Sequence, residues 1–515
     1  MLAEPRSGTA GPRRAGLSGT APAGGDPVPT DRVLVVWLLA GLALLALLTL
    51  HPAVDPDLFA RVAVGRLVEM SGGVVKQDPF AFTPRLDQWV DHEWLAGVVF
   101  YRVARWGGDA ALLALALTMM GTTVGLLVRA QEELGRASAA WSLLTLVPAV
   151  GIWISVVRSR TFTFLFVAIL LLVLVRWHNG RRGWIWLLPP CFVLWANLHG
   201  GFVAGLGLLG VSALAVSVRE RRRASPLWLC LGACVLATLV NPFGLDYWTY
   251  ILAATTRERP MILEWQTMRG WQIGIVVVLL LTFVGGAWRS GEGRRPPAEA
   301  WAMAGVSLWA AIDSQRLLNF LLVVLCVYGA GPYRAVVGGL VGPLSQPWRV
   351  ALRRVSAAGA LLAMAGLAVV SGRNLHRFAG TGLSYEAFPV GAVEWLERRG
   401  PGGRVLTHFN HGSFALWRLY PRYRVALDGR YEETYPDETV DMAALALQPR
   451  LPGHDEALAD VDPDFIVVPE REWADAFGDG WEVIYEDSAA VLIARPGRVG
   501  EPAARPVRPM WTPGF

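Results

Sequence analysis

Long apolar runs separated by short polar loops dominate this chain of 515 residues. A helix needs about 20 apolar residues to cross the hydrocarbon core of a bilayer, and several runs approach that length. Charged residues make up only 17% of the chain, whereas soluble proteins carry roughly a quarter. We therefore expect an α-helical polytopic membrane bundle and exclude a purely soluble enzyme, a disordered chain and a fibrous repeat.

The apolar runs predict about eleven transmembrane helices within residues 32–372. Their approximate bounds are 33–50, 109–128, 138–157, 161–177, 184–199, 201–218, 226–240, 272–288, 299–315, 317–333 and 354–371. Residues 1–31 are rich in Gly, Pro, Ala and Arg. They are expected to form a disordered cytoplasmic tail, because such a composition cannot bury a core.

Arginines in every second loop indicate how the bundle is oriented. The loops that should face the cytoplasm carry, in order, Arg129 and Arg136; Arg176, Arg181 and Arg182; Arg219 and residues 221–223; Arg289, Arg294 and Arg295; and Arg334, Arg349, Arg353 and Arg354. This is the positive-inside pattern. We expect a multi-pass protein of the bacterial inner (cytoplasmic) membrane, with its N-terminus in the cytoplasm. Because the arginines follow the spans, the net charge of +5 is not taken as a sign of nucleic-acid binding.

The composition changes to that of a soluble protein at about residue 380. Short β-rich runs near 403–409, 423–427, 464–468, 481–485 and 490–494, with a helix near 413–420, predict a small α/β domain over 380–496. An odd number of spans places this domain outside the cytoplasm. Its HGSF and DGR segments are interpreted as turns, and residues 497–515 as a loose tail.

Two acidic motifs bracket the first outside loop, residues 51–108. The DPD motif supplies Asp55 and Asp57, and the DHEW motif supplies Asp91, His92 and Glu93. Each motif alone would pass as a turn or a helix cap, but both fall at predicted membrane boundaries on the same side. Between them, the residues from 58 to 67 suggest an amphipathic helix lying at the membrane surface.

Cations and amides also appear at outside ends of the predicted spans. Arg158 and Arg160 break the positive-inside pattern, so either an anionic phosphate or snorkelling to lipid headgroups must account for them. The segment WANLHGGF supplies Asn197 and His199, either for the site or for helix packing.

Two further outside segments carry polar residues. The long loop after residue 240 supplies Asn241 and Glu264 and has the length of a lid. In AIDSQRLLNF, Asp313, Arg316 and Asn319 are spaced by three and should share one helix face, where Asp313 and Arg316 either pair or leave Arg316 for a ligand. All these motifs map to one side of the membrane, so we expect one extracytoplasmic cavity holding carboxylates and cations.

With these motifs in this order, the chain resembles the GT-C class of membrane glycosyltransferases, which includes oligosaccharyltransferases, protein mannosyltransferases and aminoarabinose transferases. DPD stands where the class places its first-loop acid, and DHEW stands near the end of that loop. The chain is also similar to bacterial glycosyltransferase-like membrane proteins that share DPDLW-like, WVDHEW-like and HGG-like motifs. It has no WWDYG segment as in oligosaccharyltransferases, so transfer to protein asparagine is not expected.

The resemblance implies transfer of a sugar from a polyprenyl-phosphate-linked donor to a glycan, lipid or protein acceptor outside the cytoplasm. It implies a carboxylate base, for which Asp55 or Asp57 is expected, and cations for the donor phosphate. The candidate phosphate ligands are Arg158, Arg160 and Arg316. The other candidate cavity residues are His92, Asn197, His199, Asn241, Glu264 and Asn319.

Two questions stay open at the level of the sequence. Asp91 and Glu93 are candidates for acceptor binding, and with Asp57 they are also candidate ligands for a divalent cation such as Mg or Mn, which prefers oxygen ligands. The alternative functions are a flippase or export component for lipid-linked glycans, and a ligase that transfers a glycan block. A transporter should carry polar groups along the whole membrane depth, whereas here they concentrate at the outside ends.

Overall fold

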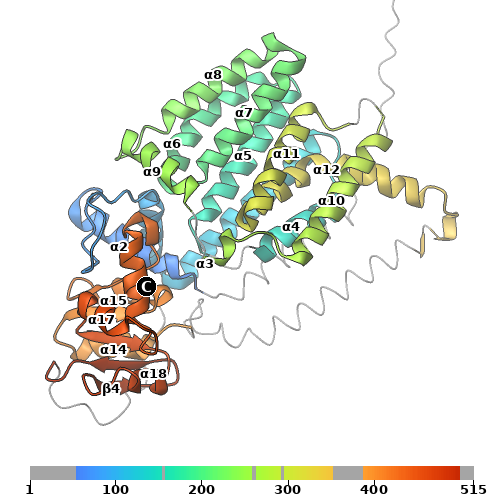
Figure 1. The fold of residues 1–515 in the computed structure, drawn as a ribbon. Helices are drawn as coiled ribbons and strands as arrows, with labels where there is room; N and C mark the ends of the chain where they lie inside the picture. The colour runs from blue at the N-terminus through green and yellow to red at the C-terminus, as the bar shows by residue number, and fades with distance from the viewer. Residues whose placement is uncertain are drawn as a thin grey trace, which may run out of the picture.

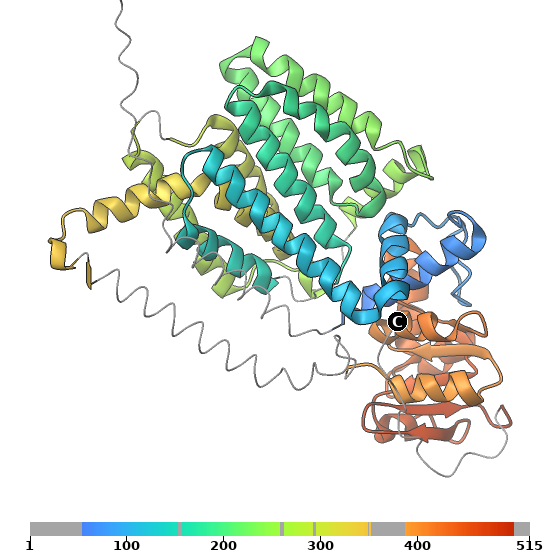
Figure 2. The same cartoon turned by 180° about the vertical axis from the view of Figure 1, so that it is seen from behind.

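The structure is a computed structural model that describes residues 54–152, 157–257, 262–291, 295–348, 350–351 and 387–498. Figures 1 and 2 show a bundle of helices, α3 to α12, with the strands and helices of the C-terminal segment gathered at one end beside α2. The helices of the first half are α2 Pro56–Ser71, α3 Trp94–Glu133, α4 Ala139–Ile152, α5 Arg160–His178, η1 Arg182–Leu187, α6 Leu188–Leu198, α7 Phe202–Arg219 and α8 Arg221–Ala237. They are followed by α9 Leu245–Thr256, η2 Leu263–Trp265, α10 Gly270–Arg289, α11 Ala298–Asp313, η4 Gln315–Leu317 and α12 Leu318–Val341.

Five stretches of helix in the described residues are long and apolar enough to cross a membrane: Trp94–Glu133, Arg160–His178, Phe202–Arg219, Gly270–Arg289 and Gln315–Val341. Helices α4, α6, α8 and α11 coincide with predicted spans but are shorter, at 14, 11, 17 and 16 residues. The predicted spans 33–50 and 354–371 and both predicted tails lie wholly or mostly outside the described residues. The count of eleven spans is therefore not confirmed.

Helix α3 begins earlier than expected. It starts at Trp94 and passes through a kink at Gly107 and Gly108, where Gly108 has φ 59° and ψ −151°. A residue with a side chain rarely adopts that conformation. The predicted span 109–128 is the part of α3 beyond this kink, and residues 94–107 form the helical part before it.

Helix α2 is present, but the prediction that it lies as an amphipathic helix on the membrane surface is wrong. Asp55 caps it by accepting a hydrogen bond from the Asp57 N–H at 3.0 Å, and Gly72 ends it with φ 70°. The helix packs against α3 and α15, and Leu58, Val62 and even Arg61 are buried.

The C-terminal segment contains a five-stranded sheet of order β2-β1-β3-β5-β4. Its strands are β1 Gly403–Thr407, β2 Tyr423–Val425, β3 Phe465–Val468, β4 Glu482–Glu486 and β5 Val491–Ala494. Strands β2, β1 and β3 are parallel, whereas β5 runs antiparallel to β3 and β4. The helices are α14 Val390–Arg399, α15 Phe409–Leu419, η5 Tyr431–Glu433, α16 Asp437–Ala446, α17 His454–Val461 and α18 Arg471–Asp475.

The first loop is joined to the edge of this sheet. Ala81 forms a parallel bridge with Val425 of β2, and the Val425 N–H donates to the Phe80 carbonyl at 3.0 Å. Beside the bridge, Arg430 is fully buried, forms ion pairs with Asp78 and Asp428, and lies over the Phe80 ring. The DGR segment is thus more than a turn, because it ties the C-terminal segment to the first loop.

Candidate active site

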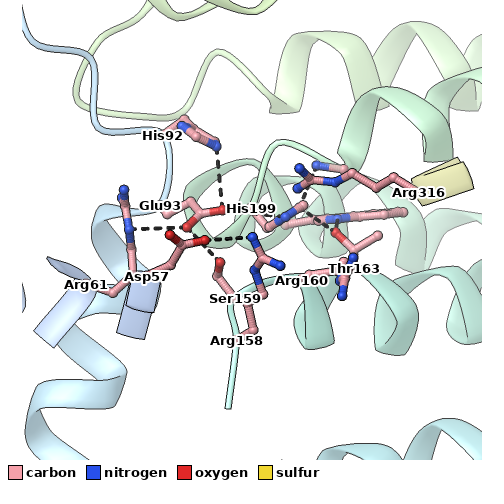
Figure 3. Close-up of polar contacts among 12 residues, drawn as sticks. Asp57, Arg61, His92, Glu93, Arg158, Ser159, Arg160, Thr163, His199 and Arg316 are labelled. Carbon is pink, nitrogen blue, oxygen red and sulfur yellow. Dashed lines mark hydrogen bonds and ion pairs between the residues drawn. The ribbon is translucent and has the colours of Figure 1, made fainter. Parts of the chain in front are cut away.

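The candidate site consists of two neighbouring clusters of ion pairs, and Figure 3 shows polar contacts among residues that belong to both. They bring together the DPD and DHEW motifs, the start of α5, the turn between α6 and α7, and η2, η4 and η5. Most of the predicted site residues lie in these clusters, although they come from segments that are far apart in the sequence.

The first cluster is centred on Arg61, which is 4% exposed. Its guanidinium forms ion pairs with Asp91, with Glu93 at 3.3 Å and with Glu433 of η5 at 3.0 Å. Burial alone would lower the pKa of Arg61, but these three carboxylates raise it well above its usual value. Asp91 is 1% exposed, so it serves this cluster and has little access to a substrate.

The second cluster is centred on Glu264 of η2. The Glu264 carboxylate pairs with Arg316 at 2.9 Å, Arg158 at 3.1 Å and Arg160 at 3.2 Å. Burial would raise the pKa of Glu264, but the three arginines lower it to about 2. One carboxylate therefore faces three guanidinium groups, two of which, those of Arg160 and Arg316, share Glu264 as their carboxylate partner.

Arg158 links this cluster to the DPD motif. It pairs with Asp55 at 3.2 Å and with Asp57 at 2.6 Å. Asp55 is buried and caps α2, whereas the side chain of Asp57 is 32% exposed. Burial raises the pKa of Asp57 to about 7, with the charges of Asp55 and Glu93 adding to the rise and Arg158 opposing it. Of the two candidate bases, Asp57 has both the access and the pKa for the role.

Glu93 lies between two imidazoles. Its Oε1 atom is 3.5 Å from His92 Nε2 and 3.5 Å from His199 Nε2, while Oε2 accepts a hydrogen bond from the Ser159 hydroxyl at 2.6 Å. Burial would raise the pKa of Glu93, but Arg61, His92 and His199 lower it to about 2. Glu93 therefore stays ionised at neutral pH and is a weak base.

His92 is held between carboxylates. Its Nδ1 atom lies 3.1 Å from Glu433 and its Nε2 atom faces Glu93. Burial would lower the pKa of His92, but Glu433 and Glu93 outweigh that effect and raise the pKa to about 9. His92 therefore carries a positive charge at neutral pH.

The two glycines after His199 are required by close packing. A Cβ atom on Gly200 would lie 3.2 Å from the His92 ring, and one on Gly201 would lie 2.2 Å from Thr163 Oγ1. The HGG motif therefore places the His199 ring between α5 and the DHEW segment.

We expect Gly201→Ala to lower the free energy of unfolding by about 1–3 kcal/mol, because the added methyl group must push Thr163 or the His199 ring aside. Gly207→Ala in α7, the helix that Gly201 precedes, is the control, since a Cβ atom there meets nothing within 4 Å. Thermal unfolding of the purified protein in detergent measures both. Equal midpoints for the two variants would contradict the packing role of Gly201.

The predicted amides do not contribute to the ion-pair clusters. Asn197 accepts from Trp94 Nε1 at 2.9 Å and donates to the Val240 carbonyl, so it joins helices. Asn241 accepts from the backbone N–H groups of two residues in its own turn. Asn319 is buried, and neither amide atom has a hydrogen-bond partner among the described residues.

One expectation from the sequence is corrected. Asp313, Arg316 and Asn319 do not share a helix face, because α11 ends at Asp313 and a break at Ser314 precedes η4 and α12. Asp313 is exposed, and Arg316 pairs with Glu264 and stacks on Trp265 at 4.8 Å. The loop after residue 240, which was expected to act as a lid, contains the short helices α9 and η2.

Residues missed by sequence reasoning include Arg61, Ser159, Thr163 and Glu433. Arg61 follows Asp57 by four positions, so the two residues lie on the same face of α2. This spacing could have identified Arg61 as a candidate site residue. Glu433 is 372 positions from Arg61, and no local pattern signals such a contact.

The site does not suit a resident Mg or Mn ion. Of the carboxylates considered as ligands, Asp57 is paired with Arg158, and Asp91 and Glu93 are paired with Arg61. The guanidinium groups occupy the positions beside the carboxylates that a cation would take. Among the residues that the structure describes, no three His, Cys, Asp or Glu side chains are placed to hold a metal ion.

No family model matches the chain, and no curated protein matches it. Solved structures do. The archaeal oligosaccharyltransferase AglB from Archaeoglobus fulgidus, in complex with an inhibitory peptide and a dolichol-phosphate, matches with a TM-score of 0.57 at 12% identity, over 84% of this chain and 69% of its own.

Two further enzymes have the same fold. ArnT from Cupriavidus metallidurans, bound to undecaprenyl phosphate, has a TM-score of 0.51 at 16% identity over 92% of this chain and all of its own. The arabinofuranosyltransferase AftD from Mycobacteria has a TM-score of 0.53 at 16% identity over 90% of this chain and 41% of its own. The chain therefore has the fold of the GT-C membrane glycosyltransferases, as the sequence motifs predicted.

Proposed function

We propose that this protein is a membrane glycosyltransferase that moves a sugar from a polyprenyl-phosphate-linked donor to an extracytoplasmic acceptor. The observation that carries the proposal is the position of Asp57, a partly exposed carboxylate paired with Arg158, which shares the Glu264 carboxylate with Arg160 and Arg316. A base thus lies next to a group of arginines, in a fold whose solved members include enzymes bound to polyprenyl phosphates.

The chemistry follows from that arrangement. Asp57 takes the proton of the acceptor hydroxyl as its oxygen attacks the anomeric carbon of the donor sugar. The bond from that carbon to the phosphate oxygen breaks, and its electron pair stays on the lipid phosphate. Arg158, Arg160 and Arg316 stabilise the negative charge that develops there. The acceptor is a glycan, a lipid or a protein.

Glu264 gives the arginines their arrangement before the donor arrives. Three guanidinium groups held close together repel one another, and one carboxylate within 3.2 Å of each offsets that repulsion. Arg160 and Arg316, which have one carboxylate between them, are suited to a phosphate, which offers several acceptor oxygens.

The experiment that tests the proposal is donor binding by Arg316→Ala. Loss of one charge-assisted contact should raise the dissociation constant for undecaprenyl phosphate about tenfold or more. The control is Arg289→Ala, an exposed arginine at the far end of α10. Binding to purified protein in nanodiscs at one fixed salt concentration measures both. Equal affinities for wild type and Arg316→Ala would remove Arg316 from the phosphate site.

The reaction products distinguish a transferase from the alternative functions, a flippase and a ligase. A flippase moves the lipid-linked sugar across the bilayer without releasing lipid phosphate, whereas a transferase releases it. A ligase uses the same base and leaving phosphate but requires a donor carrying an oligosaccharide. The concentration of charge at one end of the bundle favours transfer over transport.

We also propose that the site and the C-terminal segment face the outside of the bacterial inner membrane, with the N-terminus in the cytoplasm. The exposed residue Ser488, changed to cysteine, should then react with a membrane-impermeant maleimide in intact spheroplasts. The control is the same labelling of wild type, whose cysteines lie in helices of the bundle. Labelling of Ser488→Cys only after permeabilisation would reverse the topology.

A further inference from the structure

The tautomer of His199 is fixed by its neighbours. The backbone N–H of Gly201 donates to His199 Nδ1 at 2.8 Å, so Nδ1 carries no proton. The Thr163 hydroxyl lies 2.8 Å from the same atom and accepts from Trp195 Nε1 at 3.0 Å, which leaves its own proton for Nδ1. The proton of a neutral His199 must therefore be on Nε2.

The Nε2–H group of His199 points toward Glu93. Burial lowers the pKa of His199 to about 3, which agrees with a neutral ring that donates through Nε2 alone. His92 presents a second N–H, also from Nε2, to the same oxygen, Glu93 Oε1. Both contacts are 3.5 Å long, whereas a good N–H···O hydrogen bond is about 2.9 Å.

These three side chains present two donors and one acceptor that are only loosely engaged with one another. They also keep part of their surface exposed, at 16% for His92, 11% for Glu93 and 8% for His199. A hydroxyl group has two lone pairs and one proton. It can therefore accept from both imidazoles and donate to the carboxylate at the same time.

We propose that His92, Glu93 and His199 form a binding site for one hydroxyl group of the donor sugar. The inference rests on the proposed function. The donor is favoured over the acceptor because His199 also lies beside the arginine cluster, and Figure 3 shows it between Glu93 and Arg316. A phosphate held by Arg160 and Arg316 would place its own sugar against these three side chains.

Glu93 is suited to this role and not to that of the base. Its Oε2 atom is held by Ser159 and Arg61, so its position is fixed, and Oε1 is the oxygen left to face a ligand. Thr163 and Gly201 are positioning residues, because they act on the sugar only through His199.

The test compares two lipids on full-length protein in nanodiscs: undecaprenyl phosphate and the same lipid carrying arabinofuranose, with a mannose-bearing lipid as a second sugar. The quantity of interest is the dissociation constant of undecaprenyl phosphate divided by that of the sugar-bearing lipid. This ratio measures how much the sugar adds to the affinity. His199→Ala should reduce that ratio about three- to tenfold and leave binding of undecaprenyl phosphate unchanged. His199→Gln should restore part of the ratio, because its amide N–H can replace Nε2–H. His408→Ala, at an exposed position in the C-terminal segment, is the control.

The outcomes separate this inference from the proposed function. If wild type does not bind undecaprenyl phosphate or either sugar lipid, the proposed function fails. If it binds undecaprenyl phosphate but His199→Ala leaves the ratio unchanged for both sugars, the hydroxyl site is wrong while the function stands. An equal loss of affinity for both lipids in His199→Ala would also overturn the hydroxyl-site inference, because His199 would then contribute to phosphate binding or to folding.

A second measurement does not depend on a folded variant. Donors in which single sugar hydroxyls are replaced by hydrogen are tested on wild type alone. We expect replacement of the hydroxyl at one position to lower affinity by the same three- to tenfold factor. Equal affinities for all the deoxy donors would overturn the inference.

Discussion

Asp57→Asn should lower the rate of sugar transfer by at least about 100-fold, the usual contribution of a general base. Binding of undecaprenyl phosphate should change little, because the base acts on the acceptor proton and not on the donor. The base works only when deprotonated, and the pKa of Asp57 is about 7. In wild type the rate should therefore rise as the pH increases through about 7.

The matched comparison is Asp55→Asn. Asparagine still caps a helix, and Asp55 is buried away from substrate, so this variant should retain more activity than Asp57→Asn. Turnover of purified protein across pH 5 to 9 measures both. A fully active Asp57→Asn variant would end the assignment of Asp57 as the base, and greater damage from Asp55→Asn would transfer that role to Asp55.

The largest effect on stability is expected from Arg61→Met. The change leaves Asp91, Glu93 and Glu433 buried without their shared cation. Removing one partner of a buried ion pair costs about 3–5 kcal/mol, so the thermal midpoint should fall by many degrees and transfer should be lost.

Arg66→Met is a close control for Arg61→Met. It removes the same charge from the same helix, but Arg66 donates to the carbonyl oxygens of Trp417 and Tyr420 and leaves no carboxylate behind. Unfolding followed by tryptophan fluorescence in detergent compares the two. A loss in Arg66→Met as large as that in Arg61→Met would mean that the charge of the helix matters and the buried cluster does not.

The sequence predicted the meeting of DPD and DHEW because both motifs bracket one loop that must return to the bilayer. Asp57 and Glu93 lie close enough together that the charges of Arg61, Arg158 and Glu93 all act on Asp57. The arginines at the start of α5 were also predictable, since a cation at an outside helix end requires a partner. The local sequence pattern was sufficient to predict that these residues belong to the site.

Other features of the site could not be predicted from the local sequence pattern. Glu433 reaches Arg61 only because the C-terminal segment folds back onto the first loop, and the pairing of segments 372 positions apart is set by tertiary packing. Periodicity misplaced Arg316 for a related reason: spacing by three implies a shared face only if one helix continues, and the chain breaks at Ser314. The sequence pattern placed helix α2 at the membrane surface because, in the sequence, a buried arginine such as Arg61 looks the same as an exposed one.

The bridge between Ala81 and β2, with the buried pairing of Arg430 and Asp78, has a consequence for biosynthesis. The ribosome makes the DPD and DHEW motifs early, but the carboxylate that completes their surroundings is made more than three hundred residues later. Until that last part of the chain has folded and docked, Arg61 and His92 lack one of their partners. A prematurely terminated chain would therefore lack Glu433 and could not complete the surroundings of Arg61 and His92.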